Sequence, residues 1–417
     1  MRFGVPAALV LLVLAVSAYA EDEYLDRLAE QLTFSNAPGD IRARLSGTVE
    51  LEGYIFPQPA PAYLASRSDA LFNPRFTSFL DVQVGASVYA FVQYRVDRGF
   101  DPGARHLRGR LDEYAVRWKP LGEGALNLQL GKFATVVGNW VTRHGAWENP
   151  FVTAPLVYEE LTGVWDDGAA RTSETLLGWS HVRPRAVRGA PATDKFQRLP
   201  VIWGPSYTTG IAVSGEVGRL IYAVEMKNAS IASRPRVWEV EDLHFRHPTW
   251  SGRLGYRPNQ MWNLGVSGST GTYLRASAIR TVPPGLGLGD YRQMVIAQDL
   301  GFAWHHLQIW AELFETRFEV PGVGDADVVA YYIEAKYKFT PQLFGAVRWN
   351  EQLYGRIPDA AFGGETRWGL NVRRLDLGVG YRFTPHTQLK TQYSLQLEEN
   401  GPREVAHLWS AQLMLRF

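Results

Sequence analysis

The sequence predicts an all-β protein, a transmembrane antiparallel up-and-down β-barrel of about 16 strands, with about 18 as the alternative count. Three observations predict it: an export signal at the start, apolar and polar residues that alternate over most of the chain, and an aromatic last residue. Short turns are expected at the periplasmic rim and long loops at the extracellular rim.

The first residues have the organisation of a secretory signal peptide. Arg2 is followed by an apolar run over residues 7–16 and by Ala18-Tyr19-Ala20, a small-x-small cleavage pattern. The apolar run is shorter than the roughly 20 residues of a membrane-spanning helix. We therefore assign residues 1–20 to a signal peptide, which directs the chain out of the cytoplasm.

The composition fits a barrel with one face in lipid and the other in water. The chain is 46% hydrophobic and 20% charged, contains 14 Trp, 19 Tyr and 40 Gly, and has no Cys. It has 43 basic and 42 acidic residues, and removal of Arg2 with the signal leaves it formally neutral. This balance argues against a nucleic-acid partner.

Residues 21–40 are expected to be a short periplasmic helix or lead-in, because Tyr24, Leu25, Leu28 and Leu32 have helical spacing. A mobile terminus is the alternative. The barrel is then expected to occupy residues 41–417, with one long connection, at about 134–205, running inward or lying outside the cell.

Alternation is clearest near the C-terminus. In 329–339 the odd positions are apolar or aromatic, whereas Glu334, Lys336 and Lys338 occupy the other face. Further hairpins are predicted at 79–96, 112–133, 208–227, 253–270 and 294–318, with turns near residues 85–87, 120–124, 218, 258–260 and 305–306.

Some assignments are less regular. Residues 57–74, 320–327 and 355–366 are expected to be long loops. The strand at 368–383 keeps its alternation only with a bulge at Arg373-Arg374. An additional strand pair around 175–181 and 199–203 would raise the count from 16 to 18.

The last strand ends in Phe417. Trp409, Ala411, Leu413 and Leu415 share its face, and polar residues occupy the other face. A terminal aromatic on an alternating strand is typical of the signal that the barrel assembly machinery reads, so Phe417 is predicted to be that signal.

The segment Leu130-Gly131-Lys132-Phe133, with Gly138 after it and residues 94–99 before it, resembles the phosphate-selective porin family of the O and P type. The resemblance implies a barrel of about 16 strands, usually trimeric, that passes small anions or other polar solutes. The chain departs from the family at Val136-Val137, where a Pro is common, and it lacks a Lys-rich ladder. The resemblance therefore supports a porin better than it supports phosphate as the solute.

A porin requires a constriction, which we predict in the segment after residue 133. The predicted constriction residues are Trp140, Arg143, His144, Trp147 and Glu148. An ordinary packed extracellular loop is the alternative. From the alternation, the predicted lumen-lining charges are Arg95, Arg117, Lys336, Lys338, Arg348, Glu334 and Glu312.

The sequence contains no nucleophile elbow, phosphate loop or zinc motif, so no catalytic residue, cofactor or metal is predicted. His305-His306, Asp242 with His244 and His247, and Asp325 with Asp327 were considered as metal ligands, and a solvated turn or loop is preferred in each case.

We therefore predict a porin of the bacterial outer membrane that allows passive diffusion of small polar or ionic solutes. The expected partners are outer-membrane lipid and lipopolysaccharide, the barrel assembly machinery, two further copies in a homotrimer, and small polar or anionic solutes, without nucleic acid. The alternative is a barrel enzyme, or a barrel that sheathes a partner protein such as a cytochrome.

Overall fold

A computed structural model describes residues 23–56, 64, 68–99, 102–104, 106–121, 124–181, 197–238, 245–361, 363–399 and 405–417. The signal-peptide assignment lies outside these residues. Within them, sixteen antiparallel strands, β2 to β14 and β17 to β19, form a closed barrel in which each strand pairs with its neighbours in sequence. The predicted fold class is confirmed, and the count is 16, not 18.

The strands that form the barrel are β2 (Ile41–Ile55), β3 (Ala70–Val84), β4 (Val88–Asp97), β5 (Arg108–Trp118), β6 (Asn127–Phe133), β7 (Thr208–Val217), β8 (Leu220–Lys227), β9 (Thr249–Tyr256), β10 (Trp262–Thr272), β11 (Arg292–Trp304), β12 (Leu307–Val320), β13 (Gly324–Lys338), β14 (Leu343–Tyr354), β17 (Asn371–Arg382), β18 (Thr387–Glu399) and β19 (Val405–Arg416). All five predicted hairpins are present.

Closure joins the two ends of the sequence. β19 pairs with the Thr48–Ile55 part of β2, and Gly47 and Phe417 exchange backbone hydrogen bonds of 3.1 and 3.0 Å. Beyond Phe417 the open edge of β2 is covered by β1 (Thr33–Ser35), which follows a helix over residues 23–31. A free strand edge in a membrane would leave backbone groups unpaired, and this arrangement avoids it.

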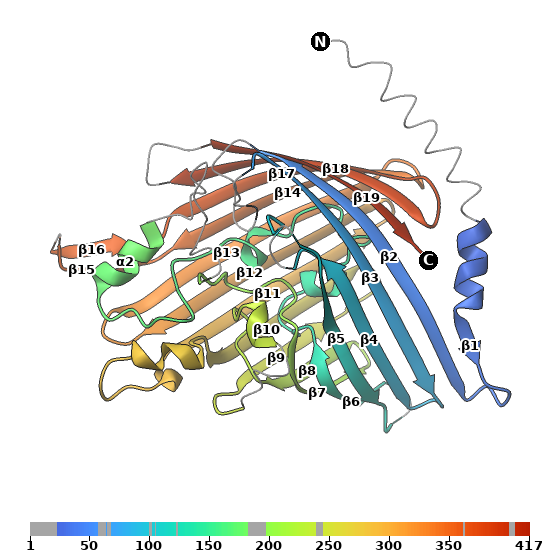
Figure 1. Cartoon of the computed structure of the whole chain (residues 1–417), viewed down its shortest axis with the longest axis horizontal. Coiled ribbons are helices and arrows are strands. Elements are labelled where there is room, and N and C mark those ends of the chain that lie inside the picture. The colour runs from blue at the N-terminus through green and yellow to red at the C-terminus, as the bar shows by residue number, and fades with distance from the viewer. Residues whose placement is uncertain are drawn as a thin grey trace, which may run out of the picture.

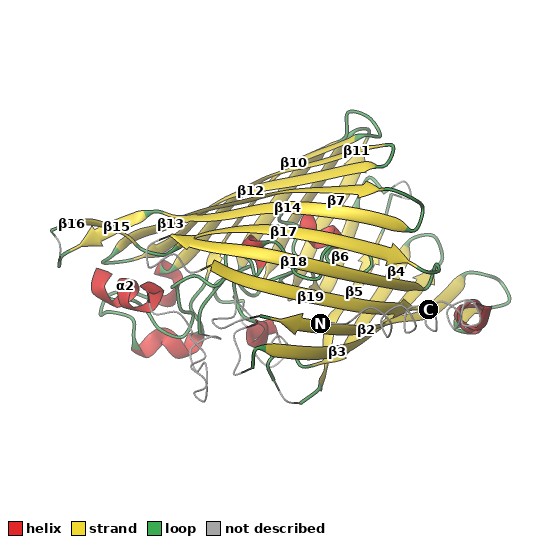
Figure 2. Cartoon of the chain, turned by 90° about the horizontal axis from the view of Figure 1, so that it is seen from above, coloured by secondary structure: helices red, strands yellow, loops and turns green. Residues whose placement is uncertain are grey.

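The two rims of the barrel differ. Short turns join β3 to β4, β7 to β8 and β11 to β12 at one rim, where the N-terminal helix and the C-terminus also lie (Figure 1). The other rim carries the long connections, with helix α2 (Ser173–His181) and the hairpin of β15 (Arg356–Asp359) and β16 (Gly364–Arg367), and Figure 2 shows it at the opposite end of the barrel. We call these the short-turn rim and the long-loop rim.

The strands have two chemically different faces. On β13 the outward Ile333 is 53% exposed, whereas the inward Glu334 is fully buried. Outward aromatic residues such as Trp118, Trp304 and Trp409 are at least half exposed. An apolar exterior with aromatic residues near strand ends suits a lipid bilayer, in which such side chains lie at the interface.

The interior is occupied in part by the connection between β6 and β7, residues 134–207, which we call the inserted loop. It turns inward at Gly138, whose φ of +79° is a conformation that glycine adopts readily. Its short helices η2 (Trp140–Arg143) and η3 (Leu156–Tyr158) lie inside the barrel, where side chains of the loop join an extended cluster with inward residues of β11 to β14.

Several local predictions were wrong. Residues 175–181 belong to a helix, and residues 199–203 are non-strand parts of the inserted loop, because both are held by contacts inside the molecule that a local pattern cannot report. β17 pairs without a bulge, whereas the register shift lies between Gln93 and Tyr94 of β4. Among the described helices, none is long and apolar enough to cross a membrane.

The loop predictions need similar correction. β3 begins at Ala70, so the predicted loop at 57–74 is too long. The segment 320–327 is a tight connection because β12 and β13 extend into it, and 355–366 contains the β15–β16 hairpin. Polar strand ends that project beyond the lipid have the composition of loops, which explains these errors.

Closure should depend on the packing of Phe417 against β2. A Cβ added at Gly47 would lie 2.6 Å from Phe417 Cζ, whereas one at Gly53, also on the outward face of β2, would meet nothing within 4 Å. We expect Gly47→Val to destabilise the barrel by about 1–2 kcal/mol, as overpacking does, and Gly53→Val to be neutral or stabilising. Urea unfolding in lipid vesicles measures both, and equal stability of the two variants would contradict this packing.

Candidate functional site

The first turn of the inserted loop is fixed by one carboxylate. Glu312 on β12, which is 2% exposed, accepts hydrogen bonds from the backbone N–H groups of Asn139 and Trp140 and from the Tyr158 hydroxyl at 2.8 Å. Gly138 N donates to Ser267 Oγ on β10 at 3.1 Å. Buried backbone donors without ladder partners are thereby satisfied by the barrel wall.

The next turn of the loop is held by β18. Lys390 Nζ donates to the carbonyl oxygens of Ala146, Asn149 and Phe151 at 2.6, 2.9 and 3.1 Å. Gln392 Oε1 accepts from the N–H groups of Val152 and Thr153. Two adjacent inward side chains of one strand therefore fix the loop from residue 146 to residue 153.

A buried charge network fixes the remainder. Arg348 on β14 and Arg374 on β17 are at most 1% exposed, and each contacts Asp376. Arg348 also pairs with Glu334 at 3.3 Å and donates to the carbonyl of Ala154 at 3.1 Å. Charged groups tolerate burial only when they are paired and hydrogen-bonded. The network is therefore part of the contact between this side of the wall and the loop.

These hydrogen bonds place the loop from residue 138 to residue 154 against β10 to β18. On the opposite side, a cavity of about 910 Å³ lies between the loop and the wall formed by β19, β2, β3 and β4. Its lining includes Pro385, His386 and Phe417, so it opens at the short-turn rim. We call it the vestibule and take it as the candidate functional site.

The wall of the vestibule carries a charge ladder that runs from β2 to β5. Arg75 pairs with Glu50 at 2.9 Å and Glu52 at 3.1 Å. Towards β5 the ladder continues through further ion pairs, namely Arg75 with Asp97, Arg95 with Asp112, and Arg110 with Asp97 and Asp112. Arg95 and Arg75 retain exposure of 18% and 22%, so the ladder faces water on the vestibule side.

The structure brings four of the five predicted constriction residues to the vestibule. Trp140, His144, Trp147 and Glu148 line it. Arg143 faces away from it, because its guanidinium donates to Glu334 at 2.5 Å and to the Tyr332 hydroxyl at 3.0 Å. The role of these residues as a constriction stays a prediction, and Arg143 acts in the structure as a tether to β13.

The predicted lumen charges divide into two groups. Arg95 lines the vestibule, Arg117 donates to Gln129, and Lys336 and Lys338 lie on the inward face of β13. In contrast, Glu312, Glu334 and Arg348 are at most 2% exposed and bind the loop or one another, so they do not line an open lumen. Alternation predicts the inward face correctly but does not show which part of that face the loop covers.

Sequence reasoning missed the cation at the centre of the ladder. Arg75 follows Pro74, and Pro74 suggested a loop, although both residues pair with β2. Proline on a strand removes one donor without preventing pairing of its carbonyl. The alternation of Phe72, Pro74 and Phe76 with Asn73, Arg75 and Thr77 was the signal that could have identified this strand.

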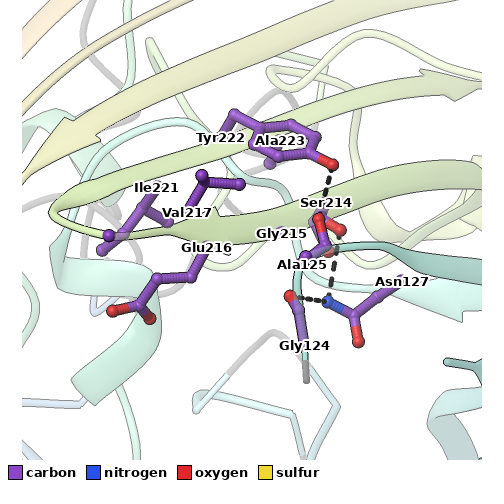
Figure 3. Close-up of a pocket in the computed structure, with 11 residues that line it drawn as sticks. Gly124, Ala125, Asn127, Ser214, Gly215, Glu216, Val217, Ile221, Tyr222 and Ala223 are labelled. Carbon is purple, nitrogen blue, oxygen red and sulfur yellow. Dashed lines mark hydrogen bonds between the residues drawn. The ribbon is translucent and has the colours of Figure 1, made fainter. Parts of the chain in front are cut away.

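A second hollow lies near the turns that join β5 to β6 and β7 to β8. The hollow has a volume of about 650 Å³ and lies at the short-turn rim. Asn127 donates there to the carbonyls of Gly124 and Ser214, and Tyr222 donates to that of Ala125 (Figure 3). These hydrogen bonds hold the β5–β6 turn to β7 and β8. Its polar groups therefore have structural partners.

The considered metal ligands are explained otherwise where the structure describes them. Asp325 and Asp327 both pair with Arg317. His305 and His306 form the β11–β12 turn, and His247 lies beside Gly289. Asp242 and His244 lie outside the described residues. The described residues contain no group of three His, Asp or Glu side chains that could hold a metal ion.

The Lys390 contacts should stabilise the loop strongly. Lys390→Met removes the ammonium group that donates all three hydrogen bonds. We expect the free energy of unfolding to fall by about 2–4 kcal/mol, because three buried carbonyl oxygens lose a charged donor. Lys338→Met changes a half-buried lysine on β13, and its free energy of unfolding should stay within about 0.5 kcal/mol of that of the parent chain. Urea unfolding monitored by tryptophan fluorescence measures both variants, and equal stabilities would contradict the tether.

His144 should make stability depend on pH. Its Nδ1 lies 2.5 Å from the Val141 carbonyl oxygen and its Nε2 lies 2.6 Å from the Tyr207 hydroxyl, and burial lowers the pKa of His144 to about 4. The neutral ring is therefore favoured in the fold, and its contribution is complete above the ordinary pKa of about 6.5 and declines as the pH falls towards 4. We expect the melting temperature of His144→Gln to fall less between pH 7 and pH 4 than that of the parent chain. If the melting temperatures of the variant and the parent chain fall equally with pH, His144 does not cause the pH dependence.

Comparison with known proteins identifies the fold. No protein-family model and no curated protein matches the sequence. Among solved structures, the chain is similar to OmpF of Salmonella typhi in complex with daunomycin, with a TM-score of 0.56, 11% identity, and coverage of 92% of this chain and 100% of that chain. It is also similar to the anion-selective porin from Comamonas acidovorans, with a TM-score of 0.54, 10% identity, and coverage of 90% and 100%.

A third similar structure is the in-vitro folded OmpT, an outer membrane protein of Vibrio cholerae in its trimer form, with a TM-score of 0.53, 8% identity, and coverage of 90% and 99%. At these identities the likeness concerns the fold alone. The membership in the phosphate-selective O and P family is not shown. The chain has the closed 16-stranded β-barrel fold of outer-membrane porins.

Proposed function

We propose that this chain is an outer-membrane porin that allows passive diffusion of small polar or ionic solutes. One observation carries the proposal: the inserted loop is bound to the β10–β18 side of the barrel and leaves a vestibule lined by charged side chains on the opposite side. An ion-paired, water-facing wall is a suitable path for hydrated solutes. A barrel with a dry, packed core would not require a charged, water-facing wall.

The charges at the short-turn rim favour anions over cations. Five inward basic residues lie on β13, β17, β19 and β2, and none of them has an ion pair within the described part of the chain. They are Arg44, Lys336, Lys338, Arg382 and Arg416. Asp26, Glu113 and Glu148 line the vestibule nearby. Because the five basic side chains have no ion pair among the described residues, we propose that they raise the local concentration of small anions at the entrance.

The same function sets the location and the partners. An apolar outer band requires outer-membrane lipid and lipopolysaccharide around the barrel, and insertion requires the barrel assembly machinery, for which Phe417 would be the signal. A homotrimer is proposed because a barrel of similar fold is known in a trimer form. Small polar or anionic solutes complete the expected set.

The structure favours the porin over a sheath for a partner protein. The inserted loop occupies the barrel interior beside the vestibule, so a partner such as a cytochrome would have to displace a hydrogen-bonded segment. The barrel-enzyme alternative lacks a specific observation that favours it. A porin needs no chemistry beyond the wall that is present.

Planar-bilayer recordings of the purified protein test the proposal. We expect stepwise currents, and we expect Arg382→Gln/Arg416→Gln to lower the anion-to-cation permeability ratio about twofold or more, because two rim charges are removed. Arg317→Gln/Arg373→Gln removes the same charge from outward, exposed positions and should leave the ratio unchanged. An absence of steps in folded protein would refute the porin, and an unchanged ratio in the first variant would refute the anion preference.

A further inference from the structure

The vestibule ends at a carboxylate that is saturated with donors. Glu52 on β2 is 1% exposed. It accepts four hydrogen bonds, from Tyr54 Oη at 2.9 Å, Asn73 Nδ2 at 3.0 Å, Arg75 Nη2 at 3.2 Å and Gln412 Nε2 at 2.8 Å. The carboxylate therefore determines how the neighbouring amides are oriented, since only their N–H₂ groups can donate to it.

As a consequence, two amide oxygens are left without partners. Within the described part of the chain, Asn73 Oδ1 and Gln412 Oε1 are buried and accept no hydrogen bond, and each residue is only 2% exposed. Thr77 Oγ1 and Ser410 Oγ on the same wall are also buried and unpartnered. Unpartnered buried oxygens also occur elsewhere in the interior, for example at Thr249 and Thr316. The four named here differ in lying in or next to cross-strand rows that begin at the vestibule, so we take them as positions where water or a polar solute binds.

The strand register places these atoms in a sequence along the barrel. Met414, Glu50 and Arg75 form a cross-strand row that lines the vestibule. Towards the long-loop rim, the next row is Gln412, Glu52 and Asn73. The row after it is Ser410, Tyr54 and Leu71. The unpartnered oxygens therefore continue the vestibule towards the long-loop rim.

From the third row onwards the wall becomes largely apolar. Tyr54, Phe56, Leu64 and Leu408 are at most 8% exposed and pack together, with Leu71 and the loop residue Val152 against them. We call this cluster the collar. Apolar constrictions in channels limit the passage of hydrated ions because water leaves a narrow apolar segment readily.

We infer that the permeation path continues from the vestibule along β19, β2 and β3, past the Gln412–Glu52–Asn73 row, and that the collar is its rate-limiting barrier. This inference rests on the proposed porin function and specifies its route. Solute would move between the wall and the loop segment near Val152. The β10–β18 side, to which the loop is hydrogen-bonded, would carry no flow.

Because the chain has no Cys, single cysteines can report the route. Ser410→Cys lies on the proposed path, whereas Ser269→Cys replaces an inward serine of β10 of similar burial, at 8% against 6%, whose hydroxyl accepts a hydrogen bond from Ser251 on β9. During bilayer recording, a charged methanethiosulfonate reagent should remove most of the current of Ser410→Cys and leave that of Ser269→Cys unchanged. Anionic and cationic reagents are both applied, so that rim charge does not determine the result.

The collar is tested by truncation. Leu408→Ala should raise single-channel conductance about twofold or more if the collar is the barrier. Val295→Ala on β11, an apolar truncation in the interior cluster at 2% exposure, should leave the conductance unchanged. Val152→Ala in the loop provides a second collar variant if Leu408→Ala does not fold, and gel mobility before and after heating identifies the folded barrel.

The outcomes separate the two proposals. Block at residue 410 together with a raised conductance in a collar variant supports the route. Block at residue 269 with none at 410, or unchanged conductance in both collar variants, overturns the route while the porin function stands. If the folded parent chain passes no current, the proposed function itself fails.

Discussion

The structure depends on one kind of interaction: side chains of the barrel wall that hydrogen-bond to the backbone of a loop inside it. A segment within a barrel has no ladder partner for its N–H and C=O groups, and each unsatisfied group would cost free energy. Glu312, Lys390, Gln392 and Arg348 supply those partners from four positions on three strands. Without them the loop would have no fixed path through the interior.

The distribution of these side chains also determines where the open space lies. Since they are on β12, β14 and β18, the loop is held on one side, and the vestibule is left beside β19, β2, β3 and β4. The same strands carry the Arg75 ladder, whose members form ion pairs with one another. One half of the wall thus anchors the loop, and the other half faces the vestibule.

The sequence was sufficient for the fold because strand alternation is a local property. The two faces of β13, the hairpin turns and the terminal strand with Phe417 all follow from neighbouring residues. The site was less predictable, because burial under a loop depends on contacts far apart in sequence. Glu312 looks like any other inward acid until Asn139, 173 residues away, is seen to bind it. Arg75 was not identified as a wall residue, because Pro74 suggested a loop. Residues 175–181 were considered as a strand, although tertiary contacts hold them as a helix.

The central claim is that residues 138–156 are folded inside the barrel and held by its wall. Hydrogen–deuterium exchange of the folded protein in lipid tests this most directly. The amides of Trp140, Val152, Thr153 and Leu156, which donate to wall side chains, should exchange nearly as slowly as those of the neighbouring strands. Exchange at the rate of an unstructured peptide would place the loop outside the barrel and contradict the account.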